Sequence, residues 1–167
     1  MIQILVLCTG NSARSILGEV LLNALGSGRI SAFSAGSRPA GRVNPGALRK
    51  LEREGHVTDG LSSKSWDVFT GPTAPGFDLV ITVCDNAAGE SCPIWNGSPL
   101  TVHWGIPDPA SASDDELDAA FDVAYARFRR RIEALVQLPL ESLDSESARE
   151  ALDAIHALAE AREDNEH

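Results

Sequence analysis

Short apolar runs alternate along the chain with segments in which apolar side chains recur every three or four residues. The short runs predict strands, the third of them continuous enough to be buried on both faces of a sheet: residues 2–8, 29–35, 77–84 and 101–104. The helical spacing predicts helices at residues 14–25, 45–55 and 114–137, the second opened by Asn44 as N-cap and Pro45 as first helical residue. This alternation predicts an α/β fold, with a doubly wound, four-stranded parallel sheet and helices on both faces.

Residues 1–140 are expected to form this domain, and residues 141–167 a helical C-terminal extension. The extension carries nine acidic and two basic side chains, whereas residues 1–140 carry fifteen and twelve. Asp144 or Ser145 could cap the helix, whose apolar side chains are Ala148, Ala151, Leu152, Ile155 and Leu158. We interpret it as a helix that packs on the domain surface. A helix that docks a partner is the alternative.

Composition and charge narrow the classes of function. A chain of 167 residues with a formal net charge of −10 and no basic stripe is not expected to bind nucleic acid. No apolar run in the sequence approaches the roughly 20 residues that span a membrane. The chain enters its first strand at once, without a signal peptide, so we expect a monomeric cytoplasmic protein. In that reducing compartment, three cysteines favour reactive thiols over a disulfide framework.

The segment between the first strand and the first helix carries the strongest chemical signal: Cys8-Thr9-Gly10-Asn11-Ser12-Ala13-Arg14-Ser15. Backbone N–H groups at a helix N-terminus bind anions, and the guanidinium of Arg14 fits a tetrahedral oxyanion. The same positive field favours the thiolate form of Cys8. The segment therefore predicts a cysteine nucleophile beneath a bound phosphate-like ion. A buried cysteine that serves only as a small apolar side chain is the alternative.

Two further cysteines, Cys84 and Cys92, follow the third expected strand. Cys84 falls at a strand end, as Cys8 does, so the two thiols share one edge of the sheet if their strands are neighbours. Structural zinc is disfavoured, because the histidines lack the spacing of zinc ligands: His56, His103, His156 and His167. A thiol relay fits better, in which one thiolate forms a disulfide that another thiol resolves. Two inert buried cysteines are the alternative. We expect no bound metal or cofactor.

Asp108 stands between Pro107 and Pro109, whose rings stiffen its backbone. A fixed carboxyl group that faces an anion site could act as general acid for a leaving oxygen. The alternative is an aspartate that only caps the next turn. Beside the Cys8 loop, the general acid is the favoured interpretation.

Several stretches of residues 1–140 together resemble the arsenate reductases that share the fold of low-molecular-weight protein tyrosine phosphatases. They are Val6 to Ser15, Ser34-Ala35-Gly36, Val43-Asn44-Pro45, Thr82-Val83-Cys84, Cys92-Pro93, and His103-Trp104-Gly105 leading to Asp108-Pro109-Ala110. The resemblance implies the fold of that family and the reduction of arsenate to arsenite. Phosphate and sulfate would be competing oxyanions.

The resemblance also implies catalytic roles. Cys8 would attack arsenate while the loop amides and Arg14 hold its oxygens, and Asp108 would protonate the leaving oxygen. Cys84 would then attack Cys8, which releases arsenite and leaves a Cys8–Cys84 disulfide. Cys92 would attack Cys84, and an external thiol reductant would open the resulting Cys84–Cys92 disulfide.

Around the loop, the resemblance implies supporting residues. Asn11 would brace the loop, and Ser15 would stabilise the Cys8 thiolate by hydrogen bonding. Some members of the family bind a potassium ion through residues like Asn11, Glu19 and Ser34 together with an aspartate. Lys64 stands where that aspartate would be, and its ammonium group could replace the ion. We therefore expect no potassium requirement.

The sequence leaves two candidates for the external reductant: thioredoxin, or glutathione together with glutaredoxin. The spacing between Cys84 and Cys92 is longer than in thioredoxin-linked members. The run after Cys84 and the run that begins at Trp104 look more like members coupled to glutathione and glutaredoxin. The need for Cys92 is open for the same reason.

Two rival functions use parts of the same pattern. A low-molecular-weight protein tyrosine phosphatase would use the Cys8 loop and Asp108. Such enzymes usually have an aromatic residue where Ala110 stands, however, and they need neither Cys84 nor Cys92. The second rival is a module that senses an anion or the redox state and signals through residues 141–167. That extension is the only support for this interpretation.

Overall fold

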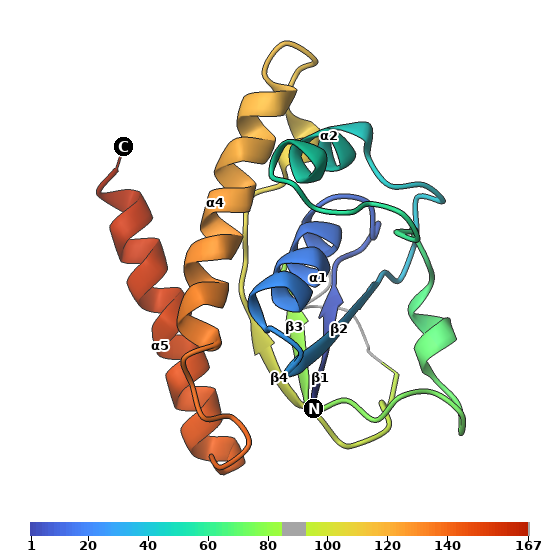
Figure 1. The fold of residues 1–167 in the computed structure, drawn as a ribbon, viewed down its shortest axis with the longest axis vertical. Coiled ribbons are helices and arrows are strands. Elements are labelled where there is room, and N and C mark those ends of the chain that lie inside the picture. The colour runs from blue at the N-terminus through green and yellow to red at the C-terminus, as the bar shows by residue number, and fades with distance from the viewer. Residues whose placement is uncertain (85–92, 167) are drawn as a thin grey trace.

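The computed structural model describes residues 1–84 and 93–166. Within these residues, four parallel strands form one sheet in the spatial order β2-β1-β3-β4: β1 (Ile2–Leu7), β2 (Ile30–Ala35), β3 (Leu79–Thr82) and β4 (Leu100–His103). The helices are α1 (Arg14–Leu25), α2 (Pro45–Arg53), α4 (Leu117–Leu135) and α5 (Ser145–Asp164), with short 3-10 helices η1 (Trp66–Phe69) and η2 (Pro109–Ser111). The predicted α/β fold with a parallel sheet is confirmed (Figure 1).

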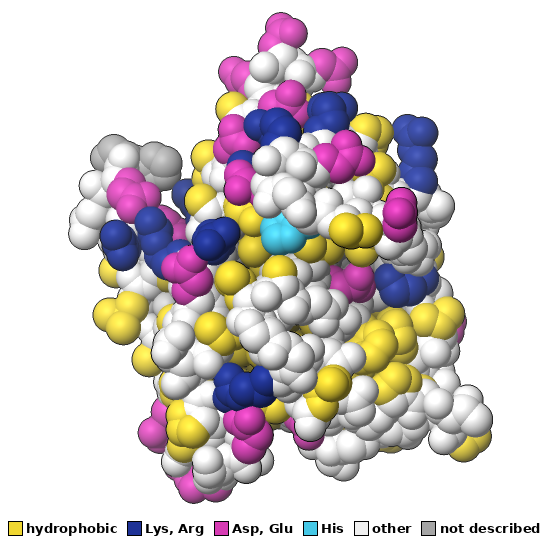
Figure 2. Space-filling model, viewed as in Figure 1, with side chains coloured by type: hydrophobic (Ala, Val, Ile, Leu, Met, Phe, Trp, Pro, Cys, Tyr) yellow, Lys and Arg dark blue, Asp and Glu magenta, His cyan; other side chains and the backbone are white. Residues whose placement is uncertain are grey.

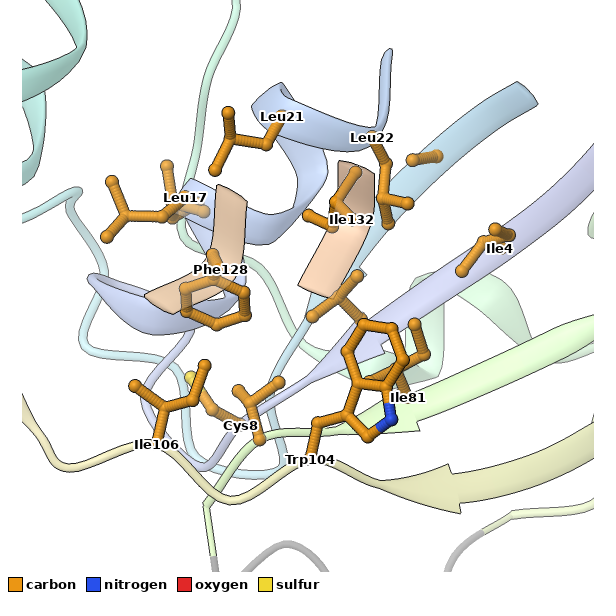
Figure 3. Close-up of a cluster of buried hydrophobic side chains, with 14 of the residues drawn as sticks. Ile4, Cys8, Leu17, Leu21, Leu22, Ile81, Trp104, Ile106, Phe128 and Ile132 are labelled. Atoms are coloured by element: carbon orange, nitrogen blue, oxygen red, sulfur yellow. The ribbon is translucent and has the colours of Figure 1, made fainter. Parts of the chain in front are cut away.

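The α-helices pack against one face of the sheet. Ile4 and Val6 of β1 share a buried cluster with side chains of α1, α2, α4 and α5. Figure 3 shows part of this cluster, which includes Cys8, Leu17 of α1 and Phe128 of α4. This packing fixes α1, and with it the loop before α1, against strand β1.

The other face of the sheet is covered by η1 and by loops. Leu5 and Leu7 of β1 point to this face, because successive side chains of a strand alternate between faces. They meet a cluster of aromatic rings in which Phe77 packs edge to face against Phe69 and Trp95. In the described residues, α-helices therefore cover one face of the sheet, and the 3-10 helix η1 with its flanking loops covers the other.

Two predicted elements exceed the observed ones by the most residues, the third strand and the long helix. The run at 77–84 contributes only Leu79–Thr82 to the ladder, and the backbone N–H of Phe77 donates instead to Asn96 O (2.8 Å). Phe77 is fully buried all the same, so the apolar run marks burial beyond the ends of the strand. The long helix predicted from residue 114 begins at Leu117, because the preceding residues form a turn.

The central strands define where a ligand can bind. β1 and β3 are neighbours, and the chain continues from β1 to one edge strand and from β3 to the other. In a parallel α/β sheet such a switch point leaves a crevice beyond the carboxyl ends of the two strands. Cys8 directly follows β1, and Cys84 lies two residues after β3. The two cysteines thus share one edge of the sheet, as the sequence predicted.

The C-terminal helix α5 packs along α4 and covers the edge strand β4 (Figure 1). Of the two candidate caps, Asp144 is the N-cap. Two hydrogen bonds tie α5 to β4 and the residue after it. Trp104 Nε1 donates to Leu152 O (3.1 Å), and Arg149 Nη1 donates to Thr101 O (2.7 Å). A covered edge cannot pair with a further strand.

Acidic and basic side chains are intermixed over the face seen in Figure 2. Nowhere in residues 1–84 and 93–166 is a helix both long enough and apolar enough to cross a membrane.

Candidate active site

Cys8 is buried at the carboxyl end of β1, next to the first turn of α1. Its Sγ lies 3.1 Å from Ser15 Oγ, a distance at which the hydroxyl can donate to a thiolate. The loop between them bends at Asn11, whose φ of 45° falls in the left-handed region that asparagine tolerates better than most residues. Because α1 begins at Arg14, the N–H groups at its start stand beside the thiol.

Hydrogen bonds from the segment after β2 turn the carbonyl groups of the loop outward. Three backbone N–H groups donate to them: Arg38 to Thr9 (2.9 Å), Ala40 to Gly10 (2.9 Å) and Asn44 to Ser12 (2.8 Å). A trans peptide holds its C=O and N–H on opposite sides, and every peptide of this loop is trans. The amides of Gly10, Asn11 and Ala13 therefore face the inside of the loop, where such amides form an oxyanion cradle.

The structure brings together the supporting residues named from the sequence. Asn11 Nδ2 donates to Ser15 Oγ (2.8 Å) and to Ser34 Oγ (2.9 Å). Ser34 Oγ donates in turn to Glu19 Oε1 (2.8 Å). Because Ser15 also contacts Cys8, the network connects the thiol to β2 and α1 and holds the loop in one shape.

Lys64 completes this network with a positive charge. Its Nζ lies 3.0 Å from Ser62 O, 3.4 Å from Asn11 Oδ1, 3.5 Å from Ser34 Oγ and 3.8 Å from Glu19 Oε1. Burial lowers the pKa of Lys64, while Glu19 acts to raise it. Four oxygen atoms thus surround the Lys64 ammonium.

Gly36 is needed for the loop to approach β2, and we expect Gly36→Ala to disrupt it. A Cβ at this position would lie 2.3 Å from Thr9 O and 2.7 Å from Cys8 O, and both are backbone atoms. The expected result is a loss of about 1–3 kcal/mol in the free energy of unfolding, measured by urea titration, together with weaker phosphate binding, measured by calorimetry.

Gly76→Ala is the matched control for Gly36→Ala, because a Cβ at Gly76 meets nothing closer than 3.8 Å. It should change the stability by less than about 0.5 kcal/mol. Equal effects of the two substitutions would contradict the role given to Gly36.

Arg14 extends from the start of α1 toward the loop after β4. Its Nη1 donates to Ile106 O (3.0 Å), and its Nη2 lies 3.7 Å from Asp108 Oδ2. Asp108 Oδ1 meanwhile accepts from Ala110 N (3.0 Å) and caps η2. The two interpretations of Asp108 are therefore compatible, because one carboxylate oxygen caps the turn and the other faces Arg14.

Cys84 is buried at the same edge and contacts the Cys8 loop. Thr9 N lies 3.4 Å and Thr9 Oγ1 3.5 Å from Cys84 Sγ. A second thiol thus lies against the residue that follows Cys8. Cys92 lies outside the described residues.

A cavity of about 560 Å³ opens beside these side chains, and Arg14, Cys84 and Asp108 line it. Arg127 of α4 and Glu163 of α5 line its other side. Within the described part of the chain, no three His, Cys, Asp or Glu side chains gather in a way that could hold a metal ion.

Sequence reasoning missed several residues that shape the site. Ser63 Oγ donates to Gly10 O (2.9 Å), and Ile106 positions Arg14 only through its carbonyl oxygen. Arg127 lies on a helix whose sequence shows only an amphipathic period. Such contacts join residues far apart in the chain, and no local pattern marks them.

The fold and the loop define a class: α/β proteins in which a cysteine thiol lies beneath an oxyanion-binding loop at the edge of a parallel sheet. More narrowly, the chain belongs to the family of low molecular weight phosphotyrosine protein phosphatases, whose family model matches residues 3–149.

Several relatives and solved structures similar to this chain are named arsenate reductases. An arsenate reductase of Brevibacillus brevis is 33% identical over 124 residues, which cover 74% of this chain and 89% of the relative. The crystal structure of an arsenate reductase from Archaeoglobus fulgidus matches with a TM-score of 0.64 and 27% identity over 81% of this chain and 99% of that chain. An arsenate reductase in a phosphate-binding state matches with a TM-score of 0.67 and 26% identity, over 82% and 98%. The resemblance found in the sequence is confirmed.

Proposed function

We propose that the protein reduces arsenate to arsenite with Cys8 as nucleophile and Cys84 as the second thiol of a relay. The observation that carries the proposal is the contact between Cys84 and Thr9, which places a second buried thiol against the loop that holds the first. Hydrolysis of a phosphate ester needs no second thiol. The relatives named arsenate reductases support the same reaction.

The chemistry starts when the Cys8 thiolate attacks arsenic and a hydroxyl group leaves with a proton from Asp108. The loop amides and Arg14 hold the remaining oxygens, where their positive field offsets the charge. Cys84 then attacks Cys8 Sγ. A sulfur–sulfur bond forms, the sulfur–arsenic bond breaks, and its electron pair stays on arsenic, which leaves as arsenite.

An external thiol reductant must then reopen the disulfide, either thioredoxin or glutathione with glutaredoxin. Attack by Cys92 on Cys84 would pass the disulfide to Cys84–Cys92 before reduction. Because the reaction consumes thiols, we place it in the reducing cytoplasm.

A phosphatase is the second candidate, because the Cys8 loop and Asp108 would also serve a phosphate ester. The description of the family model favours it. The contact between Cys84 and the loop does not, so we expect only weak phosphatase activity.

The test is arsenate-dependent oxidation of NADPH by the purified protein in two separate reducing systems. One contains thioredoxin and its reductase, and the other contains glutathione, glutaredoxin and glutathione reductase. Turnover with thioredoxin alone supports the relay that ends at Cys84–Cys92. Turnover only with glutathione and glutaredoxin keeps the reductase and makes Cys92 dispensable. No turnover in either system, with fast aryl phosphate hydrolysis, would favour the phosphatase.

Potassium is expected not to stimulate this turnover, because the Lys64 ammonium already contacts Asn11, Ser34 and Glu19. The measurement compares potassium with sodium chloride at equal ionic strength. Lys64→Asp is the informative variant, because it removes the ammonium and restores a carboxylate, so its activity should depend on potassium. Clear stimulation of the unmodified protein by potassium would contradict this role of Lys64.

A further inference from the structure

The second half of helix α5, residues 156–164, is held to the rest of the protein largely by polar contacts. Its buried residues are Ala159 and Glu163, whereas the apolar side chains of Ala148 and Leu152 anchor the first half. The α5 residues that line the cavity beside Cys84 all belong to the second half: His156, Glu160, Glu163 and Asp164. Detachment of this half would therefore remove one wall of the cavity.

His156 stands at the start of this half, and its side chain is only 15% exposed. Arg131 Nε of α4 donates to His156 Nδ1 (3.0 Å). An acceptor nitrogen carries a lone pair, so the proton of the neutral ring is on Nε2. Nε2 contacts Glu160, one helical turn further along α5. The contact between the two helices thus requires the neutral form of the ring.

Protonation of His156 at Nδ1 would break this contact. Arg131 is always protonated, so two N–H groups, each part of a cation, would face one another. Arg131 is not free to turn away, because it is buried and makes a two-pronged hydrogen bond with Glu163 (2.8 and 2.9 Å). Its Nη1 also donates to Arg127 O (2.9 Å). Movement of α5 is the way to relieve the conflict.

The charged and titratable groups around His156 come from three elements: Arg131 and Arg127 of α4, His103 of β4, and Glu160 and Glu163 of α5. Burial, then the charge of Arg131, and also His103, lower the pKa of His156, whereas Glu160 and Glu163 act to raise it. The two carboxylates attract a charged ring, but they cannot return the lone pair to Nδ1. The surroundings therefore favour the neutral ring.

We propose that His156 is a pH-sensitive latch, in which the neutral ring holds the second half of α5 against α4 and protonation releases it. Release opens the cavity beside Cys84 on the side of α5. The latch acts on the wall of the cavity, so it does not depend on which reaction the site performs.

The latch weakens toward acidic pH. In the released half, His156 has the ordinary pKa of histidine, about 6.5. Because the docked ring has a lower pKa, the released form takes up a proton first as the pH falls. Docking is therefore at full strength above about pH 6.5 and weakens between this value and the lowered pKa of the docked ring.

The test is amide hydrogen exchange of the full-length protein at about pH 7.5 and about pH 5.5, corrected for the intrinsic pH dependence of exchange. Protection in residues 156–164 should fall by up to about tenfold per pH unit below about pH 6.5, because a single proton is taken up. Protection in α1 should not follow this change. The imidazole C–H signal of His156, followed by NMR, should titrate over the same pH range as the exchange.

Two variants fix the charge of the latch. In His156→Asn, the side-chain oxygen can accept from Arg131 and does not titrate, so residues 156–164 should stay protected at both pH values. His156→Lys carries a positive charge at both, so the same residues should exchange fast even at about pH 7.5.

His56→Asn is the matched control. His56 also packs against α4, where its Nε2 lies 2.7 Å from Tyr125 Oη, but the described residues that line the cavity do not include it. This variant should keep the pH dependence of α5. Protection that does not change with pH in the unmodified protein would overturn the latch. The same holds for a pH dependence that persists in His156→Asn, for full protection of His156→Lys, and for loosening of α5 at a pH where the His156 signal does not titrate.

Discussion

Cys8→Ser is expected to lower arsenate-dependent turnover by about 10⁴-fold or more, to the background of the coupled assay. A serine hydroxyl is a weak nucleophile unless a base takes its proton. The neighbour within hydrogen-bond distance, Ser15 Oγ at 3.1 Å, is itself a hydroxyl. An alcohol is a far weaker acid than a thiol, so the serine hydroxyl stays protonated beside the loop amides and Arg14. The measurement is NADPH oxidation in whichever reducing system supports the unmodified protein.

Phosphate binding separates lost chemistry from lost structure in this variant. The amides of the loop and Arg14 do not depend on the sulfur, so Cys8→Ser should bind phosphate with an affinity close to that of the unmodified protein. Cys84→Ser is the companion variant. It keeps the nucleophile, so it should carry out at most one attack on arsenate and then stall. Sustained turnover by Cys84→Ser would mean that an external thiol attacks the arsenic adduct directly, and sustained turnover by Cys8→Ser would refute the proposed nucleophile.

The sequence predicts the position of the Cys8 loop well because the strand before it and the helix after it are both encoded locally. An apolar strand, a short turn and a helical period follow one another within residues 2–25, and this succession alone places Cys8 and Arg14 at a helix N-terminus. Cys84 is predicted for a similar reason, since parallel strands bring their carboxyl ends to one edge. The apolar run at 77–84 shows the limit of such patterns, because Phe77 is buried without belonging to the ladder.

Other parts of the site depend on contacts between distant segments, which a single sequence does not encode in a readable pattern. Lys64 could be assigned to the loop only through a family resemblance, because 53 positions separate it from Asn11. No family resemblance indicated that Arg127 and Glu163 line the cavity. On α5, the apolar period predicts which face of the helix packs, but the sequence does not distinguish a buried glutamate from an exposed one.

Glu163→Gln is expected to reduce the free energy of unfolding by about 3–5 kcal/mol, because it leaves a buried charge without a partner. Arg131 is 1% exposed and Glu163 5% exposed, and Arg130 also donates to Glu163 (3.1 Å). Burial acts to raise the pKa of Glu163, but hydrogen bonds and attraction from Arg131, with Arg127 and Arg130, outweigh it and lower the pKa. The carboxylate is therefore the form that the fold stabilises, and a neutral amide cannot replace it.

Glu166→Gln provides the matched control, since Glu166 lies just beyond α5, also accepts from Arg130 (2.9 Å), and is 53% exposed. An exposed ion pair contributes less than about 1 kcal/mol, so this variant should remain close to the unmodified protein in urea unfolding. If α5 detaches before the domain unfolds, Glu163→Gln should instead show fast hydrogen exchange confined to α5. Equal effects of the two substitutions on both measurements would mean that Glu163 behaves as a surface charge. Arg131→Met combined with Glu163→Leu should recover most of the lost stability, because removing both buried charges leaves neither one unpaired.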